Sequence, residues 1–213
     1  MDIIHGPILS PFVRKVLITL EEKNQPYELK MVLPFSTPPE FEAISPLKKV
    51  PVFEDEHITV PDSSIICQYL DAKYPKNSIY PSDIVERAKS LWFEEYADTK
   101  LAECFGAHLF FERIVKKMMR RETDEVKVKD NLENRVPPMQ DYLDKNIPET
   151  GFFGGERLNI ADISLGTHFL NARYARHEVD ADRWPKLAAY ITRVLDSAAF
   201  KKRIADEAKL MNR

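Results

Sequence analysis

The chain has 213 residues, enough for one large domain or two small ones. Hydrophobic residues make up 44% of it and charged residues 31%, which is the ordinary composition of a soluble globular protein. The formal net charge of -3 lacks the basic excess of nucleic-acid-binding proteins, so we expect no nucleic acid as a main partner.

The cysteines and the apolar runs exclude further classes of protein. Only Cys67 and Cys104 are present, far apart and without a CxxC spacing, which excludes a disulfide scaffold or a zinc cluster and suits a reducing compartment. The five histidines show no ligand spacing, so no metal is expected. Residues 1–10 do not predict a secretory signal, and no apolar run approaches membrane-spanning length. We therefore expect a cytoplasmic, soluble protein without a membrane partner.

Residues 1–75 alternate between strand-like and helix-like patterns. Val13, Val16, Leu17 and Leu20 recur at helical spacing, for example. The expected order is β-α-β-α-β-β-α, and its segments are "DIIH" (2–5), "SPFVRKVLITLEEK" (10–23), "YELKMVL" (27–33), "PPEFEAI" (38–44), the hairpin "VPVFED…HITV" (50–60) and "SSIICQYLDAKY" (63–74). A strand–helix–strand start favours a mixed sheet that contains one parallel pair joined by a crossover.

The pattern changes after "PKNSIYPSD" (75–83), a Pro/Asn/Ser stretch typical of a linker. From about residue 83 onward the sequence predicts helices and no strand. The expected helices are 84–121, 130–147, 160–176, 185–197 and 198–211, separated by turns that contain proline or glycine. The second half of the chain is therefore predicted to be a helical bundle.

One short stretch, "KKVPVFED" (48–55), combines a strand pattern with a proline. Val52 and Phe53 are typical of a strand, but Pro51 has no N–H for a sheet hydrogen bond and belongs at a strand edge, a strand start or a bulge. Taken alone, Pro51 could simply begin an ordinary edge strand with a trans bond. "PDSSII" (61–66), the second signature, follows soon after.

These features together resemble the glutathione transferase superfamily, over essentially the whole chain. "KKVPVFED" and "PDSSII" look like the family's V-P and [E/D]-S elements, and "ILSPFVRKV" (8–16) is similar to the serine-type active-site segment of tau-like and related bacterial members. "LNIADIS" (158–164) resembles the buried capping motif that starts the family's sixth helix. The resemblance implies a thioredoxin-like α/β domain, about residues 1–76, and an all-α domain, about residues 84–213.

The resemblance also implies where glutathione binds. In this family the V-P proline is cis, and the residue before it, here Val50, pairs its backbone with the cysteinyl unit of glutathione as a short added strand. Asp62 suits the γ-glutamyl ammonium, and Ser63, at a helix N-terminus, suits the γ-glutamyl carboxylate. Lys49 is placed to meet the glycyl carboxylate. Asp62 or Ser63 could also be only a helix cap, and Lys49 only a solvated surface residue.

Ser10 is the candidate catalytic residue. Its position before Pro11 is also that of a helix N-cap, and the two roles are compatible, because a hydroxyl at a helix start favours a nearby thiolate. His5 lies where several classes of the family have tyrosine, so a tyrosine mechanism is disfavoured. This loop also lacks cysteine, which argues against a thiol-reductase variant.

The predicted reaction is transfer of glutathione, as thiolate and co-substrate, to a small hydrophobic electrophile, with no prosthetic group. The electrophile is expected in an apolar cleft between the domains, lined by Phe12, Phe35, Leu101, Phe105 and Leu109. Family resemblance also implies a homodimer. Two alternatives stay open at this stage: a non-enzymatic binding or regulatory module, or a glutathione-dependent isomerase, dehalogenase or peroxidase.

Overall fold

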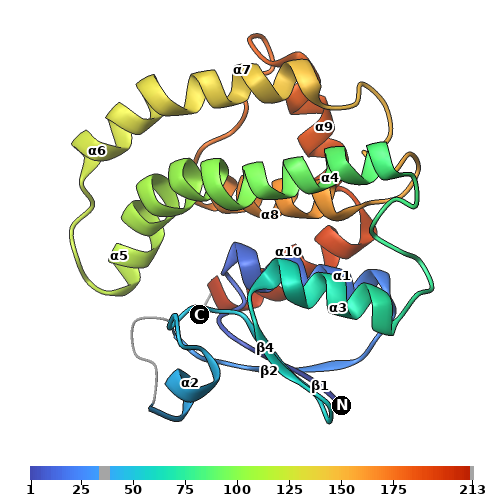
Figure 1. Cartoon of the computed structure of the whole chain (residues 1–213). Coiled ribbons are helices and arrows are strands. Elements are labelled where there is room, and N and C mark those ends of the chain that lie inside the picture. The colour runs from blue at the N-terminus through green and yellow to red at the C-terminus, as the bar shows by residue number, and fades with distance from the viewer. Residues whose placement is uncertain (34–38, 212–213) are drawn as a thin grey trace. The chain divides into compact units, whose positions relative to one another are not determined.

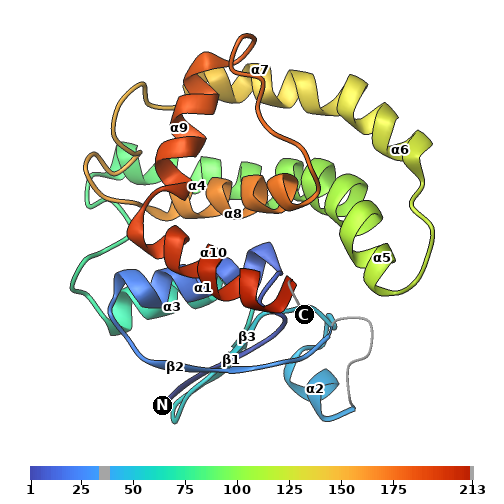
Figure 2. The same ribbon diagram turned by 180° about the vertical axis from the view of Figure 1, so that it is seen from behind.

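The computed structural model describes residues 1–33 and 39–211, with side chains up to residue 209. The chain divides into two compact units (Figures 1 and 2). The first contains Met1–Tyr80 together with Ala198–Arg213, and the second contains Pro81–Ser197.

The N-terminal unit is built on a four-stranded sheet with strand order β2-β1-β3-β4. β1 pairs with β2 in parallel, and the other neighbouring pairs are antiparallel. The strands are β1 (Asp2–His5), β2 (Tyr27–Lys30), β3 (Val52–Glu54) and β4 (Thr59–Pro61), and the helices between and after them are α1 (Pro11–Glu22), α2 (Pro39–Ile44) and α3 (Ser63–Lys73). This order confirms the predicted β-α-β-α-β-β-α pattern and the thioredoxin-like fold.

Helix α1 packs its apolar face into the core of this unit. Its four periodic apolar residues are fully buried, as the spacing predicts: Val13, Val16, Leu17 and Leu20. Figures 1 and 2 both show α1, α3 and the last helix, α10 (Ala198–Met211), lying together, with α2 apart from them. Cys67, on α3, is buried in this core, with its Sγ 3.3 Å from the Thr19 hydroxyl.

Helix α10 differs from the expected domain boundary. The sequence predicts that α10 ends the helical domain, whereas its contacts place it in the N-terminal unit, against α1. The reason is a fully buried ion pair: Arg14 of α1 donates from Nε and Nη2 to the two carboxylate oxygens of Glu207, at 2.6 and 2.8 Å. A two-point contact between guanidinium and carboxylate fixes both partners in geometry as well as charge.

The second unit is helical, as predicted. A continuous helical stretch opens it, formed by α4 (Ile84–Tyr96), a more widely wound segment η1 (Ala97–Val115) and α5 (Lys116–Met118). The helices that follow are α6 (Glu125–Asp130), η2 (Asn131–Arg135), α7 (Val136–Asn146), α8 (Ile160–Tyr174) and α9 (Pro185–Leu195). Its α6 segment begins earlier than predicted because Asp124 accepts from the Lys127 N–H and caps the helix there.

Helix α8 runs through the core of this unit and begins with the predicted cap. Asn159 accepts from the Ala161 N–H at 2.8 Å, and Asp162 accepts in return from the Asn159 N–H, also at 2.8 Å. Burial raises the pKa of Asp162 to about 6, even though the Tyr190 hydroxyl and backbone N–H groups donate to it. These reciprocal bonds satisfy the donors of the first turn and confirm the capping box.

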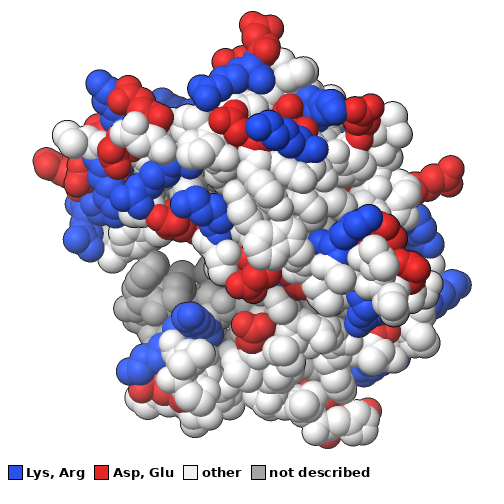
Figure 3. Space-filling model, turned by 45° about the horizontal axis from the view of Figure 1, so that its top comes forward, with Lys and Arg blue, Asp and Glu red and all other residues white. Residues whose placement is uncertain are grey.

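The surface of the helical unit is charged with both signs. Lys and Arg side chains gather at the α5–α6 end, at the left of Figure 3, with acidic side chains among them. The run "KKMMRR" (116–121) lies here and is mostly exposed, as a charged run in contact with solvent should be. Within residues 1–33 and 39–211, no helix is both long and apolar enough to span a bilayer.

Candidate active site

The sheet register brings three signature segments to one end of the sheet. His5 of β1 is paired with Val52 of β3, which is paired in turn with Pro61 of β4, so these three residues form one row. The chain leaves β1 after this row toward Ser10, enters β3 from Pro51, and leaves β4 into Asp62. Segments that lie far apart in sequence therefore meet at the same edge of the N-terminal unit.

Ser10 is the N-cap of α1 and is partly exposed. Its Oγ accepts from the Val13 N–H at 3.4 Å, which is long for a cap bond, and Pro11 occupies the first helical position. Both the capping role and a position at the positive end of the helix are therefore present. Because Ser10 Oγ is the acceptor in the cap bond, its hydroxyl proton is not used there and can be donated to a nearby anion.

A close backbone approach places Val50 beside the start of α1. Gly6, between β1 and Ser10, has a φ of +147°, and a Cβ added there would lie 2.5 Å from the Val13 side chain and 3.1 Å from the Val50 Cβ. Only glycine therefore lets the two segments meet at this point. The Val50–Pro51 peptide bond is cis, as the family resemblance implies.

The loop before Val50 is held by a residue that the sequence did not point to. Ser45 is buried, and its hydroxyl both donates to the Lys49 carbonyl at 2.8 Å and accepts from the Lys49 N–H at 3.1 Å. Lys49 itself is exposed, so its ammonium group is available to a ligand. A buried serine that binds both backbone groups of one residue fixes the path of the chain into Pro51.

Asp62 and Ser63 form the start of α3. Asp62 has a φ of +83°, a region that non-glycine residues rarely occupy and that tends to persist at functional sites. Its Oδ1 accepts from the N–H groups of Ser64 and Ile65, at 2.9 and 3.2 Å. Ser63 is buried, whereas the Asp62 residue is exposed. The helix cap and a carboxylate open to solvent are therefore combined in one residue.

Two helix N-termini consequently lie at the same end of the sheet, that of α1 beside Ser10 and that of α3 at Ser63. The two helices pack against each other along their length. Because backbone N–H groups and the helix dipole make each N-terminus attractive to anions, this edge suits a ligand with two negative groups. A thiolate and a carboxylate of one small peptide meet that description.

The residues predicted to line the electrophile site divide into three groups. Phe12 follows Ser10 in the first turn of α1 and is partly exposed, and Phe35 lies outside the described residues. Leu101, Phe105 and Leu109 have no exposed surface in the core of the helical unit, where Phe105 meets Phe169 edge-on. Side chains enclosed by their neighbours present no surface to a ligand, so these three residues are not part of the proposed electrophile site.

Two other titratable side chains, Cys104 and His5, are enclosed by the fold. Cys104 is buried, and burial raises the pKa of its thiol, which leaves it inert as a nucleophile. His5 is nearly buried, and its Nε2 lies 3.1 Å from a carboxylate oxygen of Glu54. Among the described residues, no group of three or more His, Cys, Asp or Glu side chains could hold a metal.

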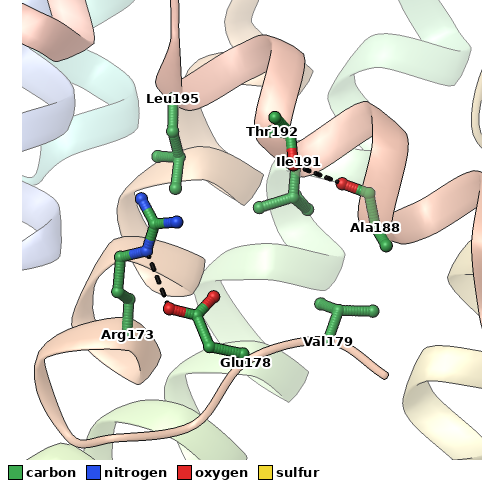
Figure 4. A pocket seen from close by; sticks show the side chains of 7 residues that line it. All are labelled: Arg173, Glu178, Val179, Ala188, Ile191, Thr192 and Leu195. Carbon is green, nitrogen blue, oxygen red and sulfur yellow. Dashed lines mark hydrogen bonds and ion pairs between the residues drawn. The ribbon is translucent and has the colours of Figure 1, made fainter. Parts of the chain in front are cut away.

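A small cavity lies in the helical unit, between the end of α8 and α9 (Figure 4). Its volume is about 60 Å³, and at its rim Arg173 donates to Glu178 at 2.9 Å. Ligand sites for small molecules are typically several times larger, about 300–1,000 Å³. We therefore do not assign this cavity to the electrophile.

The fold and the site together define a class of protein. The chain combines a thioredoxin-like unit with a separate helical unit. The first unit has a cis-proline bond before β3 and two helix N-termini at one end of its sheet. Comparison with known proteins identifies the family that has this combination.

The chain matches "Glutathione S-transferase, N-terminal domain" over residues 5–78 and "Glutathione S-transferase, C-terminal domain" over residues 127–193. A glutathione S-transferase of Hyoscyamus muticus is 26% identical over 207 residues, 94% of this chain and 96% of that protein. Glutathione S-transferase DHAR3, chloroplastic, of Arabidopsis thaliana is 30% identical over 194 residues, 89% of this chain and 67% of that protein. A glutathione S-transferase structure from Rhodospirillum rubrum F11 matches with a TM-score of 0.84 and 25% identity, over 95% of this chain and 91% of that one. The chain belongs to the glutathione transferase superfamily.

Proposed function

We propose that this protein is an enzyme that conjugates the glutathione thiolate to a hydrophobic electrophile. The observation that carries the proposal is the meeting of two helix N-termini, at Ser10 and Ser63, on one sheet edge beside Val50. Glutathione is a tripeptide with a thiol in its centre and a carboxylate at each end, so its shape and charges match this edge.

In the proposed pose, glutathione lies at the end of the sheet where the chain enters β3. Its cysteinyl backbone pairs with Val50, whose position is constrained by the close approach of Gly6. The γ-glutamyl carboxylate meets Ser63, and the γ-glutamyl ammonium meets the exposed Asp62 carboxylate. We place the glycyl carboxylate near Lys49, whose ammonium group is exposed.

In this proposal, Ser10 acts on the sulfur. Its hydroxyl donates a hydrogen bond to the thiolate, and the N-terminus of α1 adds a favourable partial charge, so the ionised form of the thiol is stabilised. The thiol proton passes to solvent. The sulfur lone pair then forms a carbon–sulfur bond with the electrophile, and an aryl halide, for example, loses its halide ion.

The first test of the proposal separates an enzyme from a binding module. Glutathione binding is measured by calorimetry, and turnover is measured with a soluble aryl halide and a panel of isomerisable, halogenated and peroxide substrates. Binding together with conjugation is expected. Binding with no turnover on any substrate would favour the regulatory module, and absence of binding would refute the proposal in both forms.

Replacing Asp62 should weaken glutathione binding by about 10- to 150-fold, because the γ-glutamyl ammonium loses a charged partner worth about 1.5–3 kcal/mol. Asp62→Ala also removes the cap of α3 and strains a position with positive φ. Asp62→Asn is therefore the sharper variant, since asparagine caps helices and tolerates this φ but carries no charge. Calorimetry on both variants gives the change in affinity.

Asp83→Ala provides a matched control for the lost cap. Asp83 caps α4 in the same way, accepting from the Val85 and Glu86 N–H groups, and lies in the helical unit. The Asp83→Ala variant should lose about as much stability as Asp62→Ala but keep the parent's affinity for glutathione. Unchanged affinity in Asp62→Asn would show that the ammonium group binds elsewhere.

Ser10→Ala should keep most of its glutathione affinity but change the pH dependence of turnover. A free thiol has a pKa of about 8.5, so about 3% is thiolate at pH 7, and lowering that pKa by about 2 raises the fraction to about 75%. Lower basicity also makes the sulfur a weaker nucleophile, by roughly eightfold for a Brønsted slope of about 0.4–0.5. The net gain is only about threefold, so positioning must supply the rest.

The profile of kcat/KM against pH checks this. We expect Ser10→Ala to reach half-maximal activity at a pH about one to two units higher, and to approach or exceed the parent in alkali, because a hydrogen bond to a charged group is worth about 1.5–3 kcal/mol. Thermal melting should show no more than the loss of a weak cap, about 1 kcal/mol. Superimposable pH profiles would mean that Ser10 only caps α1.

We also infer a homodimer that assembles through the helical unit. The outer face of α4 exposes three large apolar side chains, Ile84, Val85 and Trp92, each at least half exposed. Sedimentation should then give the mass of two chains. Relatives named chloroplastic and cytosolic both occur, and we propose a cytoplasmic location, since two buried free thiols suit a reducing compartment.

A further inference from the structure

A lysine is fully buried next to the proposed glutathione site. Lys15, on α1, has no exposed surface, and its Nζ donates to the Ser64 hydroxyl at 2.9 Å. Lysine is among the residues that proteins bury least, because removing an ammonium group from water is costly. Its burial at this position therefore needs an explanation beyond the packing of α1.

The contact joins α1 to the first turn of α3. Ser64 follows Ser63 in that turn, and the Ser64 N–H donates to Asp62 Oδ1 at 2.9 Å. Ser64 thus links Lys15, which donates to its hydroxyl, to Asp62, which accepts from its backbone N–H, in one chain of contacts. This chain runs past Ser63, the residue that we assign to the γ-glutamyl carboxylate.

We propose that Lys15 is a positioning residue that sets how strongly this site selects a ligand with a free α-carboxylate on its γ-glutamyl group. Acting through Ser64, Lys15 fixes the first turn of α3 and adds a positive charge behind it, where the helix N–H groups face the anion. Charge in a site shielded from water acts more strongly than the same charge in solvent. The inference rests on the proposed function and assigns a determinant of substrate class to it.

Lys23 offers a matched control within the same helix region. Its side chain is also fully buried, but it donates to Asp71 at 2.5 Å and to the carbonyls of Lys76 and Asn77, at the opposite end of α1 from Ser10. Loss of either lysine removes a buried ammonium group. Only Lys15 contacts the first turn of α3, so only its loss should alter ligand selection.

The experiment uses three thiol peptides and calorimetry on the full chain. Glutathione is compared with 4-aminobutyryl-cysteinylglycine, which lacks the α-carboxylate, and with glutaryl-cysteinylglycine, which lacks the α-ammonium. The parent should prefer glutathione over each analogue by at least about tenfold, the lower limit for a hydrogen bond to a charged group. The variants are Lys15→Met, Lys15→Arg, Lys23→Met and Ser64→Ala.

Lys15→Met should reduce the preference over the aminobutyryl analogue to about threefold or less, and leave the preference over the glutaryl analogue unchanged. Lys15→Arg, which keeps the charge, should recover most of the lost preference. The loss should appear mainly as a higher KM for glutathione, and kcat should change less than KM, because Ser10 is untouched. Lys23→Met should melt at a lower temperature and retain both preferences.

If Lys15→Met keeps the parent's preference over the aminobutyryl analogue, or if Lys23→Met loses it equally, Lys15 does not act on the carboxylate. If Lys15→Met does not fold, Ser64→Ala decides, since it removes the hydroxyl that Lys15 binds and should lower the same preference. A parent that binds none of the three peptides would instead refute the proposed function.

Discussion

Replacing Glu207 by alanine should lower the free energy of unfolding by about 3–5 kcal/mol, the cost of stranding one member of a buried ion pair. Arg14 and Glu207 have no exposed side-chain surface and meet through two hydrogen bonds. Without the carboxylate, the guanidinium group would stay buried without its main countercharge, or α10 would separate from α1 to let water in. Chemical denaturation followed by circular dichroism measures the loss.

Two controls show that the effect comes from the buried charge. Lys202→Ala removes a second ion pair between α10 and α1, to Glu21, but the Lys202 side chain is 58% exposed, and such surface pairs contribute about 0–1 kcal/mol. The double variant Arg14→Met/Glu207→Leu replaces both charges with apolar groups and should recover most of the stability. A loss below about 1 kcal/mol in Glu207→Ala would show that water reaches Arg14 easily.

Lys73→Met should also lower the free energy of unfolding by about 3–5 kcal/mol, because it leaves two buried carboxylates without their countercharge. At the end of α3, the Lys73 ammonium lies between Asp2 and Asp55, at 2.9 and 2.6 Å, and both carboxylates are almost fully buried. Tyr69 also donates to Asp55, at 2.8 Å, so the network ties α3 to β1 and to the turn between β3 and β4. Equilibrium unfolding at neutral pH gives the size of the effect.

The pH dependence of this variant is a sharper measurement than its stability at one pH. Burial alone would raise the pKa of Asp55, but the hydrogen bonds from Lys73 and from the His57 N–H hold it well below its usual range. A lowered folded-state pKa contributes stability above the unfolded value of about 4, and this stability is lost as the pH falls through the folded value.

The difference in free energy of unfolding between the parent and Lys73→Met should therefore become smaller as the pH falls, because protons neutralise the two carboxylates that have lost their countercharge. Lys89→Met is the surface control: Lys89 pairs with Glu86 one turn away on α4, with both side chains at least half exposed, and its loss should cost at most about 0.5 kcal/mol at any pH. A difference independent of pH would mean that Lys73 stabilises by packing alone.

The sequence was sufficient for the parts of the fold that depend on neighbouring residues. Helical spacing located α1, and cap residues located its start at Ser10 and that of α8 at Asn159. Proline in a strand pattern pointed to Val50 and Pro51. Each of these signals acts over a few residues, so it can be read without knowing which segments meet in space.

The parts of the fold and of the site that the sequence did not predict depend on contacts between residues that are distant in sequence. Lys15 and Ser64 are separated by 49 residues, and Arg14 and Glu207 by 193. In the sequence these charged side chains look like the solvated face of a helix, and only the fold reveals that they are buried. No local pattern could therefore predict that α10 joins the N-terminal unit.

The place of α10 has a consequence for how the protein is made. The N-terminal unit is interrupted: residues 1–80 leave the ribosome before residues 81–197, and the helix that carries Glu207, the partner of Arg14, is translated only after both. Domains usually fold as units in the order of synthesis. Here the first unit emerges without the buried carboxylate that Arg14 binds, so it must wait for the synthesis of α10, and a nascent chain stopped before residue 198 should be a substrate for chaperones and proteases.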